Sequence, residues 1–140
     1  RGILLTCRSA VVSHCVFQSA GAAVLLEGDA AGWFESGATQ SITLEDNLFD
    51  ACAYVSDWGR APIQVTPTVK AEDGEQRFHQ QLIVRRNHFR SIDPRLIYAR
   101  HLHTLLWQQN VVEPANDYPP LFPHAPAFDL QGVVHQEVQL

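Results

Sequence analysis

The sequence AAVLLEGDAAGWFESG, residues 22–37, joins two parts of opposite character. Its first five residues are apolar and predict a short strand. The second part is a turn with three carboxylates, Glu27, Asp29 and Glu35, and two aromatic rings, Trp33 and Phe34. Strands similar to the first part occur before and after it without the acids, so we expect a repeated scaffold that carries polar chemistry at one place.

Five segments share the frame of this strand: residues 1–6, 22–27, 61–66, 95–100 and 126–131. One alternate set of their side chains is mostly polar, as expected for a face turned to solvent. Successive strand residues point to opposite faces, so the other set should face a common core. That set is entirely apolar: Ile3, Leu5, Val24, Leu26, Ile63, Val65, Ile97, Ala99, Phe128 and Leu130.

A second strand segment follows each of the first four. The pattern Ile42-x-Leu44-x-x-Asn47-x-Phe49 returns with Asn87 and with Asn110, and an earlier copy has Cys15 in the Asn position. Asn tolerates left-handed backbone, and its amide can bond an equivalent Asn in the next coil. The sequence therefore predicts an all-β, right-handed parallel β-helix with an Asn ladder. An antiparallel β-sandwich is the alternative, but it gives no reason for Asn to recur at one register.

We expect one domain over residues 1–140, with coils at 1–21, 22–54, 55–94, 95–125 and an incomplete 126–140. Neither terminus supplies an obvious cap, which predicts a piece of a longer helix. The segment 71–76 should be a charged, solvated loop, and 114–123 an irregular surface loop.

Composition excludes several functions. A net charge of −5 gives no basic face, so neither nucleic acid nor an anionic membrane is an expected partner. No apolar run approaches the roughly 20 residues that span a bilayer. The three cysteines at positions 7, 15 and 52 lack CxxC spacing and are interpreted as small buried residues.

His101 and His103 lack a third ligand, so neither a metal nor another cofactor is expected. No serine-hydrolase or nucleotide-binding motif is present.

The strongest chemical signal is the pair Glu27 and Asp29. In an extended strand they would share a face with Cα atoms about 6.5–7 Å apart. Inverting glycosidases use two carboxyl groups about 6.5–9.5 Å apart. A turn in which Asp29 bonds backbone amides is the alternative. Glu35 lies beside Trp33, and contact with a ring would raise the pKa of its carboxyl, as suits a general acid; a solvated loop acid is equally compatible with the sequence.

Further polar candidates lie along the same outward face. Asp57, Trp58 and Arg60 precede the third strand and should form a rim near Glu27, although Asp57 is also a typical turn residue. Gln64 on the third coil and Tyr98 with Arg100 on the fourth can continue a substrate-binding column. A structural ion pair with neighbours in the column of Glu27 is the alternative for Arg100.

Residues 1–6, 23–30 and 33–37 resemble glycoside hydrolase family 110, whose members are exo-acting α-1,3-galactosidases, and residues 42–52 look like a β-helix coil of that family. The resemblance implies an inverting, metal-independent mechanism on terminal α-linked galactose, in a bacterial secreted or periplasmic enzyme. It also implies adjacent acids in the site, whereas here Gly28 directly precedes Asp29.

We therefore expect a glycosidase in which Asp29 and Glu27 activate and position water, and Glu35 or Asp57 protonates the leaving oxygen. The sugar platform would consist of aromatic rings and its binding column of polar side chains. These residues are Trp33, Trp58, Tyr98, Arg60, Gln64 and Arg100. A homo-oligomer is compatible with this hypothesis. The alternative is a non-catalytic β-helix segment that binds carbohydrate or extends a larger protein.

Overall fold

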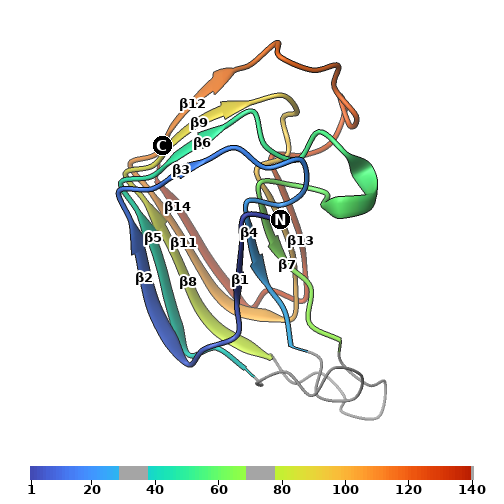
Figure 1. Ribbon diagram of the computed structural model, residues 1–140. Coiled ribbons are helices and arrows are strands. Elements are labelled where there is room, and N and C mark those ends of the chain that lie inside the picture. The colour runs from blue at the N-terminus through green and yellow to red at the C-terminus, as the bar shows by residue number, and fades with distance from the viewer. Residues whose placement is uncertain (29–37, 69–77, 140) are drawn as a thin grey trace.

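The computed structural model describes residues 1–28, 38–68 and 78–139, and in this part the chain is a parallel β-helix with three sheets (Figure 1). Sheet A contains β1 (Ile3–Leu5), β4 (Val24–Leu26), β7 (Ile63–Val65), β10 (Ile97–Arg100) and β13 (Phe128–Gln131). Sheet B contains β2 (Ser9–Ser13), β5 (Ser41–Glu45), β8 (His79–Arg85), β11 (Leu102–Gln108) and β14 (His135–Gln139). Sheet C contains β3 (Val16–Phe17), β6 (Leu48–Asp50), β9 (His88–Ser91) and β12 (Val111–Pro114).

The register of sheet A confirms the predicted frame. Ile3 pairs with Val24, Val24 with Ile63, Ile63 with Ile97, and Ile97 with Phe128, all in parallel. The prediction of two strands per coil was wrong. A turn at the Asn position divides the second segment into a strand of sheet B and a strand of sheet C.

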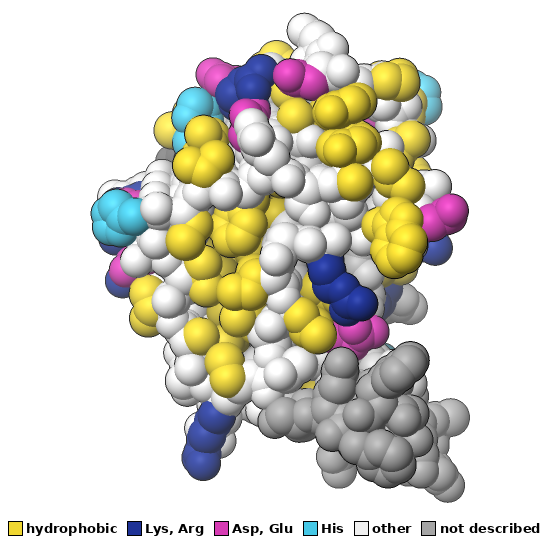
Figure 2. Space-filling view, in the orientation of Figure 1, with side chains coloured by type: hydrophobic (Ala, Val, Ile, Leu, Met, Phe, Trp, Pro, Cys, Tyr) yellow, Lys and Arg dark blue, Asp and Glu magenta, His cyan; other side chains and the backbone are white. Residues whose placement is uncertain are grey.

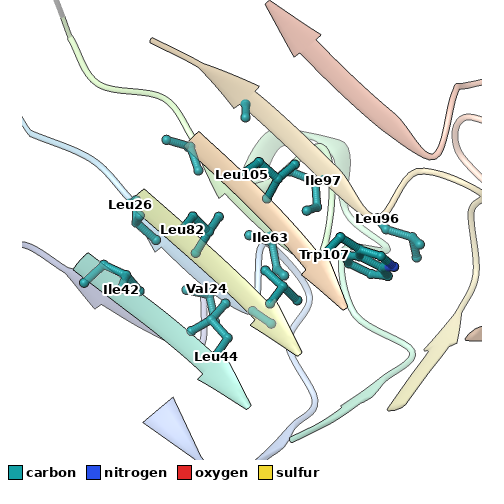
Figure 3. Close-up of a cluster of buried hydrophobic side chains, with 14 of the residues drawn as sticks. Val24, Leu26, Ile42, Leu44, Ile63, Leu82, Leu96, Ile97, Leu105 and Trp107 are labelled. Carbon is teal, nitrogen blue, oxygen red and sulfur yellow. The ribbon is translucent and has the colours of Figure 1, made fainter. Parts of the chain in front are cut away.

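The core lies inside the three sheets. Figure 3 shows the part in which branched apolar side chains of sheets A and B meet, and the stacked rings of Phe49 and Phe89 from sheet C belong to the same cluster. Val24, Ile63 and Ile97 of sheet A are fully buried, as are Leu44 and Leu82 of sheet B. Stacking of coils therefore removes these side chains from water, which is the main favourable contribution to folding of a solenoid.

The two end coils are less well covered. Figure 2 shows hydrophobic side chains between sheets A and B at the end formed by the first coil, in agreement with the partial burial of Ile3, Val12 and Phe17. Phe128 and Leu130 of the last coil are also only partly buried. Each of these two end coils packs against another described coil on one side only.

The Asn ladder is present. The side-chain amide of Asn47 donates to Asn87 Oδ1 at 3.0 Å, and that of Asn87 donates to Asn110 Oδ1 at 3.0 Å. Each amide also donates to a backbone carbonyl of the preceding coil, Val12 for Asn47 and Leu44 for Asn87. The ladder thus ties successive coils together at one corner.

The Asn was expected to adopt the left-handed backbone at this corner. The residue before it adopts that conformation instead. His14, Asp46, Arg86 and Gln109 have φ of 55°, 55°, 52° and 54°. The preceding residue makes the turn, and the Asn then satisfies backbone groups with its side chain. This division of roles could not be read from the Asn spacing alone.

The expectation for the cysteines holds for one of three. Cys52 is buried, whereas Cys7 and Cys15 are exposed, and all three are free thiols. Both exposed residues lie at turns of the first coil, where side chains face solvent. Residues 114–123 are largely exposed and irregular beyond β12, as predicted, whereas residues 71–76 lie outside the described residues. Within the described chain, no helix is long and apolar enough to cross a membrane.

Candidate active site

A short 3-10 turn, η1 (Ser56–Trp58), is held against the chain that enters β4. Ala22 N donates to Trp58 O at 3.1 Å. The approach is so close that a Cβ at Gly21 would lie 2.1 Å from Trp58 O, and one at Gly59 would lie 2.3 Å from Ala22 N. Glycine is therefore required on both sides of the contact, because any side chain would push η1 away from β4.

This turn forms one wall of a hollow of about 460 Å³ on the outer side of sheet A. Trp58 is 66% exposed beside it, and the lining is mostly polar. The residues that line the hollow are Arg1, Leu25, Glu27, Ser56, Asp57, Trp58, Gly59, Arg60 and Gln64.

Five residues singled out from the sequence meet in this hollow: Glu27, Asp57, Trp58, Arg60 and Gln64. They come from two neighbouring coils and from the segment that joins those coils. The other candidates lie outside the described residues: Asp29, Trp33 and Glu35. The assignment of catalytic and binding roles stays a prediction.

Two polar side chains of the hollow have defined partners. Glu27 Oε2 lies 3.9 Å from Arg1 Nη1, a loose ion pair between half-exposed groups. Gln64 Oε1 accepts a hydrogen bond from the Arg60 backbone N–H at 2.9 Å, and its amide donates to Thr66 Oγ1 at 3.1 Å. Gln64 thus fixes the turn that presents Arg60.

Tyr98 and Arg100 lie on the next coil, at the edge of the hollow. The guanidinium of Arg60 is 5.3 Å from the Tyr98 ring centroid and connects the two areas. Arg100 donates to Asp129 Oδ1 at 2.9 Å and to two backbone carbonyls, those of Ala99 and Asp129. Arg100 therefore forms an ion pair, but its partner is Asp129 and not a neighbour in the column of Glu27.

Sequence reasoning missed Arg1, Leu25 and Arg95. Leu25 points outward from β4 yet is only 9% exposed, and it lines the hollow. An apolar residue at an outward position was the signal that could have indicated Leu25 as part of the hollow. Nothing in the pattern indicated Arg95, which precedes β10 and packs over Tyr98.

Two acids with lowered pKa values lie at another corner, between sheets B and C. A hydrogen bond from Arg85 lowers the pKa of Glu45, and one from Arg86 lowers the pKa of Asp46. These acids are held in exposed ion pairs that stack coil on coil. They serve a structural purpose and provide matched controls for the acids of the hollow.

Among the described residues, no group of three or more His, Cys, Asp or Glu side chains lies close enough together to hold a metal ion. His103 instead contacts its neighbour Thr104, with Nδ1 2.8 Å from Oγ1. The chemistry of the hollow is that of carboxylates, guanidinium groups, an amide and an indole ring. Such a set binds hydroxyl groups and can move protons.

No family model matches the chain, but individual proteins do. It is 33% identical to alpha-1,3-galactosidase A of Bacteroides fragilis over 134 residues, which are 94% of this chain and 22% of that protein. It is 30% identical to alpha-1,3-galactosidase B of Parabacteroides distasonis, over 99% of this chain and 23% of that protein. It is 27% identical to alpha-1,3-galactosidase B of Bacteroides thetaiotaomicron, over 86% of this chain and 20% of that protein.

The chain is thus homologous along nearly its whole length to proteins named alpha-1,3-galactosidase, and the resemblance stated from its residues is confirmed. It spans less than a quarter of the length of these curated relatives.

Proposed function

We propose that the hollow beside η1 is part of the active site of an exo-acting glycoside hydrolase that removes terminal α-linked galactose. One observation carries the proposal: two acids, Glu27 and Asp57, line a single polar hollow together with the exposed ring of Trp58. The homology to proteins named alpha-1,3-galactosidase supports the choice of substrate.

The hollow suits a sugar residue in chemical terms. An indole ring offers an apolar platform to the C–H face of a pyranose. Asp57 and Glu27 can accept hydrogen bonds from sugar hydroxyls, and the guanidinium of Arg60 can donate to them. Its volume of about 460 Å³ is sufficient for one or two sugar units and suits attack at a chain end.

The proposed mechanism is a single displacement with inversion. One carboxylate, Asp29 with Glu27 as its partner, activates a water on the far face of the sugar. A carboxylic acid, Asp57 or Glu35, protonates the leaving oxygen. In inverting enzymes the two groups are about 6.5–9.5 Å apart, so that the water fits between one of them and the sugar.

A bacterial secreted or periplasmic location belongs to the same proposal. The relatives named above are bacterial proteins, which supports the bacterial part of this proposal. Fractionation of the source organism with an antibody to the full-length protein tests it. Recovery of the protein in the cytoplasmic fraction alone would contradict it.

The function is tested by incubating the full-length protein with α-1,3-, α-1,4- and α-1,6-linked galactosides and with a β-galactoside. We expect galactose release from the α-1,3-linked substrate, with β-galactose as the first anomer seen by NMR, since inversion reverses the α configuration. The Asp29→Asn variant should lose at least about 10³-fold in kcat, because removing the base leaves the water unactivated. Binding of galactosides by the folded protein without release would favour the non-catalytic carbohydrate-binding segment instead.

A further inference from the structure

A second hollow, of about 270 Å³, lies on the outer side of sheet C. Phe49 of β6 is buried in the core, so the next residue, Asp50, points to the opposite face and lines this hollow. We call it the tyrosine hollow, and its lining residues are Gln18, Asp50, Ala51, Tyr54, Asp117 and Tyr118. They differ from the residues that line the hollow beside η1 on sheet A.

Two tyrosine rings contribute to the lining. Tyr54, in the segment after β6, stacks on Tyr118 from the loop after β12, with ring centroids 3.8 Å apart and planes 13° apart. These two segments meet at one corner of the molecule (Figure 1). Tyr54 also packs against a small buried cluster of Ala51, Ile92 and Ala115, whereas Tyr118 is 43% exposed. One ring is thus anchored on the protein, and the other is presented to solvent.

An arginine fixes the acids of the tyrosine hollow. Arg90 donates from Nη1 to Asp50 Oδ1, and its Nη2 lies 3.3 Å from Asp117 Oδ2. The side-chain amide of Gln18 donates to Asp50 Oδ2 at 2.8 Å. Charge-assisted bonds of this kind are directional, so the acceptor atoms hold fixed positions before a ligand arrives.

The charges around the tyrosine hollow favour a neutral ligand. The guanidinium of Arg90 contacts three carboxylates, those of Asp50, Asp117 and Glu113, and Glu113 Oε1 is 3.7 Å from its Nε. Even with His88 protonated, at 3.3 Å from Glu113, the acids of this group outnumber its cations. An anion would therefore be repelled, and the donors of the arginine are already engaged.

Acceptor atoms remain for the hydroxyl groups of a ligand. In the described part of the chain, Asp117 Oδ1 and Gln18 Oε1 have no hydrogen-bond partner. The bond from Gln18, together with Arg90, lowers the pKa of Asp50, which therefore stays a carboxylate at neutral pH. Such a group accepts hydrogen bonds and does not protonate a leaving oxygen, so the arrangement favours binding over acid catalysis.

We propose that the tyrosine hollow is a second carbohydrate-binding site, which holds one neutral sugar unit without cleaving it. The exposed ring of Tyr118 would contact the C–H face of the sugar, and Asp117 and Gln18 would accept hydrogen bonds from its hydroxyl groups. The site does not depend on the proposed hydrolysis, because it lies on another sheet and uses other residues. Its role is to keep a glycan at the protein surface.

The test is an NMR titration of the full-length protein with methyl β-D-galactopyranoside, which a hydrolase specific for α linkages leaves intact. Trp58→Ala weakens the hollow beside η1, and we expect this variant to keep a binding site for the sugar. Adding Tyr118→Ala to it should lower the remaining affinity at least about tenfold, the effect of losing one ring contact. Adding Tyr118→Phe, which keeps the ring, should leave the affinity within about threefold.

Asn116→Ala in the same exposed loop is the matched control and should leave the affinity of Trp58→Ala unchanged. Loss of all binding in Trp58→Ala alone, or binding that survives the removal of the Tyr118 ring, would overturn the second site. The anionic counterpart, methyl β-D-galacturonide, should bind Trp58→Ala at least about tenfold more weakly, and equal binding would overturn the choice of a neutral ligand.

The second site and the proposed function fail separately. If the full-length protein releases no galactose from any α-galactoside but its sugar binding depends on Tyr118, the proposed function is wrong and the second site stands. If galactose is released and no binding depends on Tyr118, the second site is wrong and the proposed function stands.

Discussion

His79 is a fully buried titratable side chain at the start of β8. The backbone N–H of Thr39 donates to its Nδ1 at 3.2 Å, so Nδ1 is an acceptor and the ring proton sits on Nε2. Burial lowers the pKa of His79 from 6.5 to about 4. The neutral ring is therefore part of the folded state, and it joins the residues before β5 to the neighbouring coil.

This shift predicts an acid-sensitive stability. The unfolded chain binds a proton at His79 below pH 6.5 and the folded chain only below about pH 4, so stability decreases as the pH falls between these values. The shift corresponds to a loss of about 3 kcal/mol. Denaturant unfolding of the full-length protein at pH 7 and pH 4.5 measures it, and His79→Gln should reduce the difference. An equal pH dependence in both proteins would contradict the assignment.

Asn87 occupies the centre of the Asn ladder and is buried. Asn87→Ala would leave Leu44 O and the backbone N–H of Asn47 without their partners. We expect a loss of about 3 kcal/mol in the free energy of unfolding, because buried unsatisfied groups add to the lost bonds. Asn116→Ala in the exposed loop is the control and should change stability by less than about 0.5 kcal/mol. Similar losses in both variants would show that the ladder does not stabilise the stack.

The thiols differ in exposure, which predicts different reactivity. Cys7 and Cys15 are exposed, whereas Cys52 is buried and its burial raises the pKa of its thiol. Since the thiolate is the reactive form, iodoacetamide should label Cys7 and Cys15 well before Cys52 in the native protein. Peptide mass spectrometry after short labelling measures this order. Equally fast labelling of Cys52 without denaturant would contradict its placement.

At the scale of elements, the contact between η1 and the chain entering β4 fixes one wall of the hollow. A Cβ in Gly59→Ala would lie 2.3 Å from Ala22 N, so the backbone must move and carry Asp57 and Trp58 with it. A displacement of about 1 Å at a catalytic group costs on the order of 10²-fold in rate, and we expect a loss of this size in kcat/KM. Kinetics with α-1,3-galactobiose measure the loss.

Ser56→Ala is the control for the stability effect of this change, because it shortens an exposed side chain in the same turn and adds no atom near β4. It should keep the wild-type melting temperature, whereas Gly59→Ala should lower it. Full activity and stability in Gly59→Ala would mean that η1 tolerates displacement and does not position the site.

The sequence predicted the elements of sheet A with their register, because alternating apolar residues can face only one core. It did not predict that sheet C begins at the Asn corner, since periodicity does not show where a chain turns. The left-handed residues there include His14 and Arg86, which carry no turn signature. In the site, Glu27, Asp57 and Arg60 were foreseen, whereas Arg1 was not. The Asp129 partner of Arg100 lies one coil away, 29 residues on.

At the scale of the whole molecule, stacking separates structural charge from the proposed chemistry. Acids at the corner of sheets B and C are paired with arginines of the next coil, as Asp46 is with Arg86. The acids Glu27 and Asp57 lie on the opposite side of sheet A from the core, in a hollow, where Glu27 forms a loose ion pair with Arg1 at 3.9 Å. This separation makes it practical to change one set of acids while leaving the other intact.

The most direct measurement is kcat/KM for galactose release from α-1,3-galactobiose by the full-length protein carrying Asp57→Asn, Glu27→Gln or Asp46→Asn. Our account predicts losses of at least about 10²-fold for the first two variants, in which an acid of the hollow becomes an amide that cannot transfer a proton. Asp46→Asn, at the structural corner, should remain within about threefold of the wild type. Wild-type turnover in both Asp57→Asn and Glu27→Gln would contradict the placement of the active site in this hollow.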